Sequence, residues 1–334
     1  MWILDVLILS WLFAGVFKTI KSGNALNPFN RSATIPLRGI LAIMIIIHHF
    51  PVWYPKEYAC INVADGWGGA ICSLFFLLSG YGLTKSYLTK GDVYLKGFLS
   101  RRLPKIAIPA CVVLVIHLFV RFLVGGGTFD VLIIDLSNLS IIFSHYWFIY
   151  TLFIFYLIFY LSFRIFRNAV YGIVFICIAA IIYYYTTKDI LHYTENWWNS
   201  IHGIAIGSII ANIEPKVKPW LENNKVTYRF LMSFIILIVC AYNFIGCYIH
   251  YLPAWGTVFF FLLPFMVYVC NSFVSLPQCR TLNFLGGISL EIYLVHKSVM
   301  DMLHPFVTSA HVFFVSVILL SIVFAWTLKK VTYK

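Results

Sequence analysis

Apolar runs recur along almost the whole of this sequence, and most are about as long as a helix that crosses a bilayer. A spanning helix needs about 17–25 residues. Runs bounded by charged or turn-forming residues predict eleven helices, at residues 2–18, 37–53, 68–88, 104–124, 146–163, 168–186, 200–213, 228–249, 252–273, 284–303 and 311–328. The run at 200–213 is short for a span, which leaves a tilted, re-entrant or longer helix open there.

Composition leads to the same fold class. Of the 334 residues, 61% are apolar and only 11% are charged, whereas about a quarter are charged in a soluble domain. A soluble fold could not bury that much apolar surface, so lipid must be the solvent for much of it. We therefore predict an all-α, polytopic transmembrane bundle. Loops of at most about 20 residues leave no room for an appended domain, so residues 1–334 are expected to form one domain.

The first run, residues 2–18, has the length of a signal peptide but not its charge pattern. No basic residue precedes it, whereas Lys18 and Lys21 end and follow it. Because charge placement is the main discriminator, a retained leading helix is favoured over a cleaved signal.

The basic residues give the bundle an orientation. With eleven spans, most of the 24 Lys and Arg residues fall on one side of the membrane, in the stretches 18–38, 85–105, 164–167, 216–229, 280 and 329–334. Loops on the cytoplasmic side carry the excess of Lys and Arg. The N-terminus is therefore predicted outside and the C-terminus in the cytoplasm, and the net charge of +12 is mostly an orientation signal.

Ionisable side chains inside the predicted spans are the first candidates for a functional site, because they are costly at membrane depth. Arg38 and His49 lie eleven positions apart in one run. In a helix this spacing puts them within about 20° of the same face, with a rise of about 16 Å. His48 points about 80° away. A lone buried histidine is usually a packing residue, but two adjacent ones, one aligned with an arginine, favour function.

A second polar stripe lies in the run 284–303, where Ser289, Tyr293 and His296 follow helical spacing. Such a stripe is often a polar contact between helices. His296 lies about as deep as His49, so the two could meet in one cavity. Glu291 is off the stripe and needs a partner of its own.

Other motifs have a packing or interfacial explanation beside a functional one. Gly68 and Gly69, with Ser79 further along, are typical of close helix packing. The sequence His145-Tyr146-Trp147 fits an aromatic belt at the outer interface and leaves the histidine unexplained. The cluster Arg101, Arg102 and Lys105 fits either lipid headgroups or a phosphate site. The eight cysteines have no metal-ligand spacing, so no metal is expected.

Five segments together resemble the acyltransferase-3 family of membrane-bound acyltransferases. They resemble, in order, the family's Arg-x10-His, FFxLSG, RRxxRIxP, WFL and FLGxISYxIYLxH segments. In this chain they are Arg38 to His49, Ser73–Gly82, Phe98–Pro109, Trp147-Phe148 and Phe284–His296. Lys105 stands where arginine is usual, and Leu290 where tyrosine is usual. The resemblance covers residues 37–328 and leaves the helix at 2–18 as an addition to a core of about ten spans.

The resemblance implies transfer of an acyl group, usually acetyl, from cytoplasmic acyl-CoA to a hydroxyl of an extracytoplasmic carbohydrate. A multi-pass protein of the bacterial cytoplasmic membrane is expected, with lipid, acetyl-CoA and a polysaccharide or lipid-linked sugar as partners. No metal or nucleic acid is expected, and a homo-oligomer is left open. The rival classes are a transporter or flippase for a glycan or lipid-linked sugar, and a non-catalytic membrane scaffold.

Within this hypothesis each candidate residue has a role. Donor phosphates would meet Arg38, Arg101, Arg102 and Lys105, because charge-assisted hydrogen bonds to phosphate are strong. His49 would act as general base or form a transient acyl-histidine. The remaining predictions are residues that orient the histidine or stabilise the oxyanion, namely Ser79, Tyr293 and His296, and residues that bind the acceptor, namely His145, Trp147 and Glu291.

Overall fold

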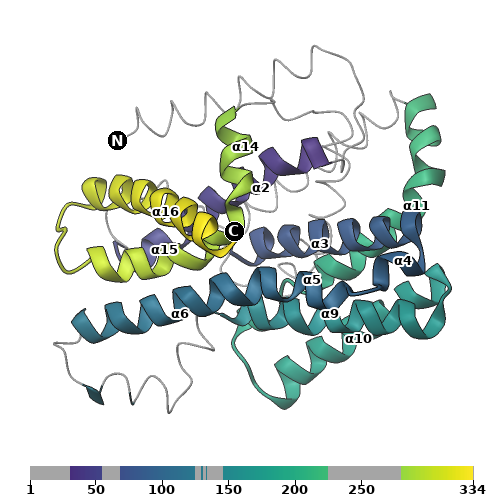
Figure 1. The fold of residues 1–334 in the computed structure, drawn as a ribbon, viewed down its shortest axis with the longest axis horizontal. Helices are drawn as coiled ribbons and strands as arrows, with labels where there is room; N and C mark the ends of the chain where they lie inside the picture. The colour runs from purple at the N-terminus through teal and green to yellow at the C-terminus, as the bar shows by residue number, and fades with distance from the viewer. Residues whose placement is uncertain are drawn as a thin grey trace, which may run out of the picture.

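The structure is a computed structural model, and it describes residues 31–54, 68–124, 129–130, 133, 146–224 and 280–333. Every regular element in these ranges is a helix, which confirms the predicted all-α class (Figure 1). The α-helices are α2 (Arg31–His49), α3 (Gly68–Lys90), α4 (Asp92–Leu95), α5 (Phe98–Arg102), α6 (Pro104–Val124), α9 (Trp147–Phe166), α10 (Ala169–Tyr185), α11 (His202–Asn223), α14 (Arg280–Gly287), α15 (Ser289–Leu303) and α16 (Ala310–Thr332). Short turns η1 (Phe50–Val52), η3 (Thr186–Ile190) and η4 (Glu195–Trp197) complete the set.

Five of the described helical segments are long and apolar enough to cross a membrane. They are Thr34–Val52, Pro104–Val124, Trp147–Phe166, Ala169–Ile190 and Ala310–Thr332. Each corresponds to a run predicted from the sequence. The predicted helices at 2–18, 228–249 and 252–273 lie outside the described residues, so the count of eleven stays a prediction.

Two predicted helices differ from those found. The run at 200–213 becomes α11, a helix of 22 residues that continues past Glu214 and Pro215. The run at 284–303 is divided, because α14 ends at Gly287 and α15 begins at Ser289. Ile288 between them has φ −113° and ψ 18°. Two consecutive glycines weaken a helix at this point, since they add no side-chain packing and lose more backbone entropy on ordering than other residues do.

Two close helix pairs hold the described bundle together, and glycines set their spacing. Helices α3 and α11 run parallel and touch along their length, because Gly203 faces the backbone of Ser73 and Gly207 faces that of Leu77. Helix α2 packs equally closely against α14, in the antiparallel direction. A methyl group on Gly39 would lie 2.7 Å from the carbonyl oxygen of Leu282, and Gly286 faces the backbone of Ile35. Helix α15 continues past this contact between α2, α6 and α16.

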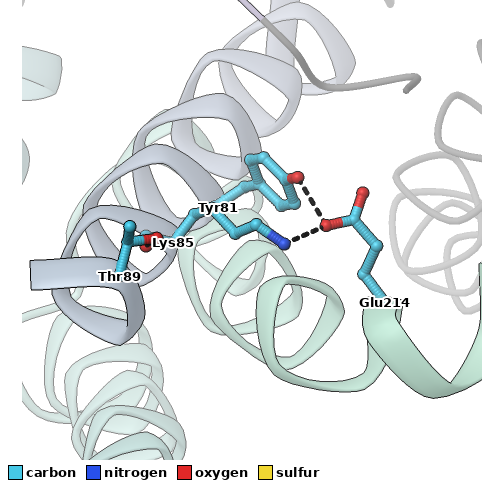
Figure 2. A network of polar contacts seen from close by, with 4 residues as sticks. All are labelled: Tyr81, Lys85, Thr89 and Glu214. Carbon is cyan, nitrogen blue, oxygen red and sulfur yellow. Dashed lines mark hydrogen bonds and ion pairs between the residues drawn. The ribbon is translucent and has the colours of Figure 1, made fainter. Parts of the chain in front are cut away.

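The α3–α11 pair also encloses an ion pair that explains how Glu214 can lie inside a helix of this bundle. The carboxylate is 2% exposed and accepts hydrogen bonds from Tyr81 at 2.8 Å and from Lys85 at 2.5 Å (Figure 2). Thr89 bonds the carbonyl of Lys85 one turn further along (Figure 2). The helix is longer than the run at 200–213, which is one of the alternatives left open for it, because the charge that follows residue 213 is neutralised by the neighbouring helix.

Removing the cation from this pair is expected to destabilise the fold. In Lys85→Met the carboxylate of Glu214 stays buried and keeps the hydrogen bond from Tyr81 but loses the one from Lys85. The free energy of unfolding is expected to fall by about 1–3 kcal/mol. Glu214→Gln should cost less, since an amide oxygen still accepts from both donors. Denaturant unfolding in detergent measures both, with Lys90→Met, an exposed lysine of the same helix, as the control. Equal stability of Lys85→Met and Lys90→Met would contradict the expectation.

Candidate active site

The structure brings together the two histidines at the centre of the predicted site. His49 is the last residue of α2, and its ring stacks on that of His296 from α15, with centroids 5.3 Å apart and planes 24° from parallel. His296 is only 3% exposed and His49 is half-buried. The contact arises because α2 and α15 pack side by side beyond the α14 crossing. We call this the histidine end of α2.

Hydrogen bonding fixes the tautomer of His296. Its Nδ1 lies 2.7 Å from the carbonyl oxygen of Tyr293 and 3.2 Å from that of Ile292. A carbonyl oxygen only accepts, so Nδ1 must donate, and in the neutral ring Nε2 then has a lone pair. Nε2 is buried and has no hydrogen-bond partner among the described residues. The site therefore holds a basic nitrogen that no described neighbour uses.

Tyr293 supports His296 and joins it to α9. The tyrosine is buried, and its ring lies 5.8 Å from that of His296 and 4.9 Å from that of Phe148. Ser289, the third residue of the predicted stripe, instead donates to the carbonyl of Gly286 at 3.1 Å. Of the predicted stripe, Tyr293 and His296 therefore lie at the histidine end, whereas Ser289 lies at the break between α14 and α15.

Toward the other end of α2, arginine side chains lie near Tyr156, a residue that sequence analysis missed. Tyr156 of α9 is buried, and Arg102, Arg38 and Ser79 lie in its neighbourhood. We call this the arginine end. Tyr156 escaped notice because it lies in a run of aromatic residues where nothing in the spacing distinguishes it. Ser79 lies near Tyr156, and its predicted role in orienting the histidine or stabilising the oxyanion stays a prediction.

The basic cluster is held in place by Tyr94, which sequence analysis also missed. Arg102 Nη2 donates to the Tyr94 hydroxyl at 3.0 Å, and Arg101 Nη2 donates to the Tyr94 carbonyl at 3.1 Å. Both arginines are exposed, as is Lys105, whose own carbonyl accepts a hydrogen bond from Tyr333 at 2.6 Å. Exposed, oriented guanidinium groups at a helix end suit the binding of phosphate.

Glu291 finds its partner at the break between α14 and α15. The side chain is 2% exposed and lies near Tyr333 and Lys329, and Lys329 itself donates to the carbonyl of Gly287. Burial, followed by the neighbouring carboxylate, raises the pKa of Tyr333, so its hydroxyl stays protonated. These neighbours give Glu291 a structural role between α15 and α16, and its contact with the acceptor stays a prediction.

Of the two outer residues predicted to bind the acceptor, His145 and Trp147, the structure describes Trp147. Trp147 is buried against Phe76 and Phe148, at centroid distances of 6.5 and 5.8 Å. His145 lies outside the described residues. In the described part of the chain, no group of three or more His, Cys, Asp or Glu side chains is arranged to hold a metal ion.

The two ends of α2 can therefore do different chemistry. The arginine end offers positive charge to an anion, and the histidine end, about 16 Å further along the helix, offers basic nitrogens. Such a separation suits a substrate that has a charged portion at one end and a reactive group at the other.

Comparison with known families and structures gives one match. The model of one family, described as an acyltransferase domain, matches residues 37–330. No curated protein and no solved structure gave a significant match.

Proposed function

Because this chain belongs to the acyltransferase-3 family of membrane acyltransferases, we propose that it moves an acetyl group from cytoplasmic acetyl-CoA to a hydroxyl of an extracytoplasmic carbohydrate. The observation that carries the proposal is the arrangement along α2, with Arg38 and Arg102 around Tyr156 at one end and His49 stacked on His296 at the other. The bundle would lie in a bacterial cytoplasmic membrane with its N-terminus outside and its C-terminus inside.

In this proposal the arginine end binds the donor. The phosphates of acyl-CoA contact Arg101, Arg102 and Lys105, and Arg38 holds the chain that leads inward. An extended pantetheine arm has a length of the same order as the rise of about 16 Å between Arg38 and His49. The thioester of a donor bound at the arginines can therefore reach the histidine end.

At the histidine end the acceptor hydroxyl attacks the thioester carbonyl. A carbon–oxygen bond forms, the carbon–sulfur bond breaks, and the hydroxyl proton passes through a histidine to the departing thiolate of CoA. His49 is the general base, and His296, whose Nε2 carries the lone pair, stacks on it and shares the site. A transient acyl-histidine on His49 is the second form of the same chemistry.

Purified protein in sealed vesicles tests the proposal. Radiolabelled acetyl-CoA is supplied on the side of Lys329 and Lys330, and the acceptor probe is cell-envelope glycan from the source cells, freed of its O-acetyl groups by mild alkali. Label should move into the glycan as an alkali-labile ester, and vesicles without protein serve as the control. If the protein neither binds nor consumes acetyl-CoA but moves glycan across the membrane, the flippase explanation replaces this one.

Loss of one arginine at the donor end is expected to weaken donor binding. Arg102→Ala should raise the KM for acetyl-CoA about tenfold, because a hydrogen bond to a charged group contributes about 1.5–3 kcal/mol. The effect should shrink as salt is raised, since exposed charges are screened. Initial rates at two ionic strengths measure it, and Arg164→Ala, an exposed arginine at the end of α9, is the control. An unchanged KM would remove Arg102 from the donor site.

A further inference from the structure

The glycine pair at the start of α3 differs from the two glycines with which α11 contacts α3. A methyl group on Gly203 or Gly207 would meet the backbone of α3. A methyl group on Gly68 would instead meet the ring of His48, and one on Gly69 would lie 2.6 Å from Nδ2 and 3.0 Å from Oδ1 of Asn199. The pair was expected to pack helices together, but it makes room for two polar side chains.

His48 and Asn199 both lie next to the histidine end of α2. The ring of His48 lies 4.7 Å from that of His49, which stacks on His296. His48 rests on Gly68, and Asn199 rests on the next residue of the same helix turn. His48 and Asn199 therefore contact consecutive residues of α3, which places Asn199 near the proposed reaction centre.

Asn199 has an unmet hydrogen-bonding need. It lies in the turn before α11, where its backbone N–H donates to the carbonyl of Glu195 at 3.0 Å. Its side-chain Oδ1 is buried and has no hydrogen-bond partner among the described residues, and the same holds for the hydroxyl of the fully buried Ser200 beside it. Buried polar atoms are seldom left without a partner, because each costs about 1–3 kcal/mol.

We propose that Asn199 binds the acceptor, with its Oδ1 accepting a hydrogen bond from a hydroxyl next to the one that is acylated. This assignment rests on the proposed transferase function. A carboxamide oxygen requires a donor. Every free hydroxyl of a carbohydrate offers an O–H, whereas the N–H and O–H donors of acyl-CoA lie in the pantetheine arm and the nucleotide, which the proposal places along α2 toward the arginine end. Asn199 also rests on Gly69, next to the glycine that His48 contacts, and so lies at the histidine end, where the proposal places the acceptor.

The test separates binding of the two substrates. With radiolabelled acetyl-CoA and the alkali-treated glycan as probes, Asn199→Ala should raise the KM for glycan about tenfold and leave the KM for acetyl-CoA unchanged. Asn199→Asp retains an oxygen acceptor at the same place and should recover part of the loss. Asn168→Ala is the matched control, since it removes the same side chain from the exposed N-cap of α10.

A second variant reaches the same contact without changing Asn199. In Gly69→Ala the new methyl group must displace the carboxamide, so the KM for glycan should rise while the helix itself gains a residue of higher propensity. In the Asn199→Ala background the same change should add nothing, because the space has been vacated. Thermal unfolding identifies any variant whose loss comes from folding.

The outcomes distinguish the two levels of the argument. If wild-type protein transfers no label to glycan, the transferase proposal fails and the role of Asn199 fails with it. If wild-type protein transfers label and Asn199→Ala keeps the wild-type KM for glycan, or raises the KM for acetyl-CoA instead, only the assignment of Asn199 is overturned.

Discussion

Replacing His49 with alanine is expected to slow acyl transfer about 10²–10⁴-fold, the range typical for removal of a general acid–base group. The ring of His49 stacks on that of His296, whose Nδ1 hydrogen is committed to the Tyr293 carbonyl. We therefore expect the two imidazoles to act as one unit, so that His296→Ala should also be strongly impaired. The double variant should be little worse than His49→Ala, because residues that work together are not additive.

Single-turnover transfer of radiolabelled acetyl groups measures these rates. His311→Ala, an exposed histidine near the start of α16, is the control and should transfer at the wild-type rate. Quenching the reaction without glycan distinguishes the two chemical forms, since an acyl-histidine leaves label on the protein and a general base does not. A His49→Ala variant that retains wild-type transfer would refute a catalytic role for this residue.

Adding one methyl group to the α3–α11 contact is expected to have the largest effect on stability. A Cβ at Gly80 would collide with the carbonyl oxygen of Ile204, and one at Gly203 with that of Ser73. Backbone atoms cannot turn aside as a side chain can, so the helices must separate along their contact. Gly80→Ala and Gly203→Ala should each cost at least about 1–3 kcal/mol, the usual penalty of overpacking, and the double variant should not yield folded protein.

Gly82→Ala is the matched control for this prediction. Gly82 lies on the same helix and is exposed, and nothing lies within 4 Å of a methyl group placed on it. This variant should be as stable as wild type or slightly more so, because alanine has the higher helix propensity. Denaturant unfolding in detergent compares the three single variants. If Gly80→Ala is as stable as Gly82→Ala, the α3–α11 contact is not as close as described.

The sequence by itself determined the class of molecule and one axis of the site. The length of an apolar run and the placement of Lys and Arg are local properties to which a bilayer responds directly, so the all-α membrane class and most described helices were predictable. Arg38 and His49 were equally accessible, because both lie on one helix and its pitch fixes their separation. The order of family segments then pointed to acyl transfer, and the match over residues 37–330 agrees.

Only the tertiary structure decided which residues of different helices meet. The contact of His49 with His296, the neighbourhood of Tyr156 with Arg38 and Arg102, and the contact of Asn199 with Gly69 all join segments far apart in the chain. A helical period shows which face of a helix is polar, but it does not show which helix will cover that face.

Ser79 and Gly68 show what residue type alone does not predict. Residue type alone assigned Ser79 to the histidine and the glycine pair to packing. Helix α3 runs antiparallel to α2, so its first turn at Gly68 lies beside His48, whereas Ser79, eleven residues later, lies with Tyr156 at the arginine end. The direction in which one helix packs on another decides which residues lie near each end of α2, and no local pattern in the sequence contains that direction.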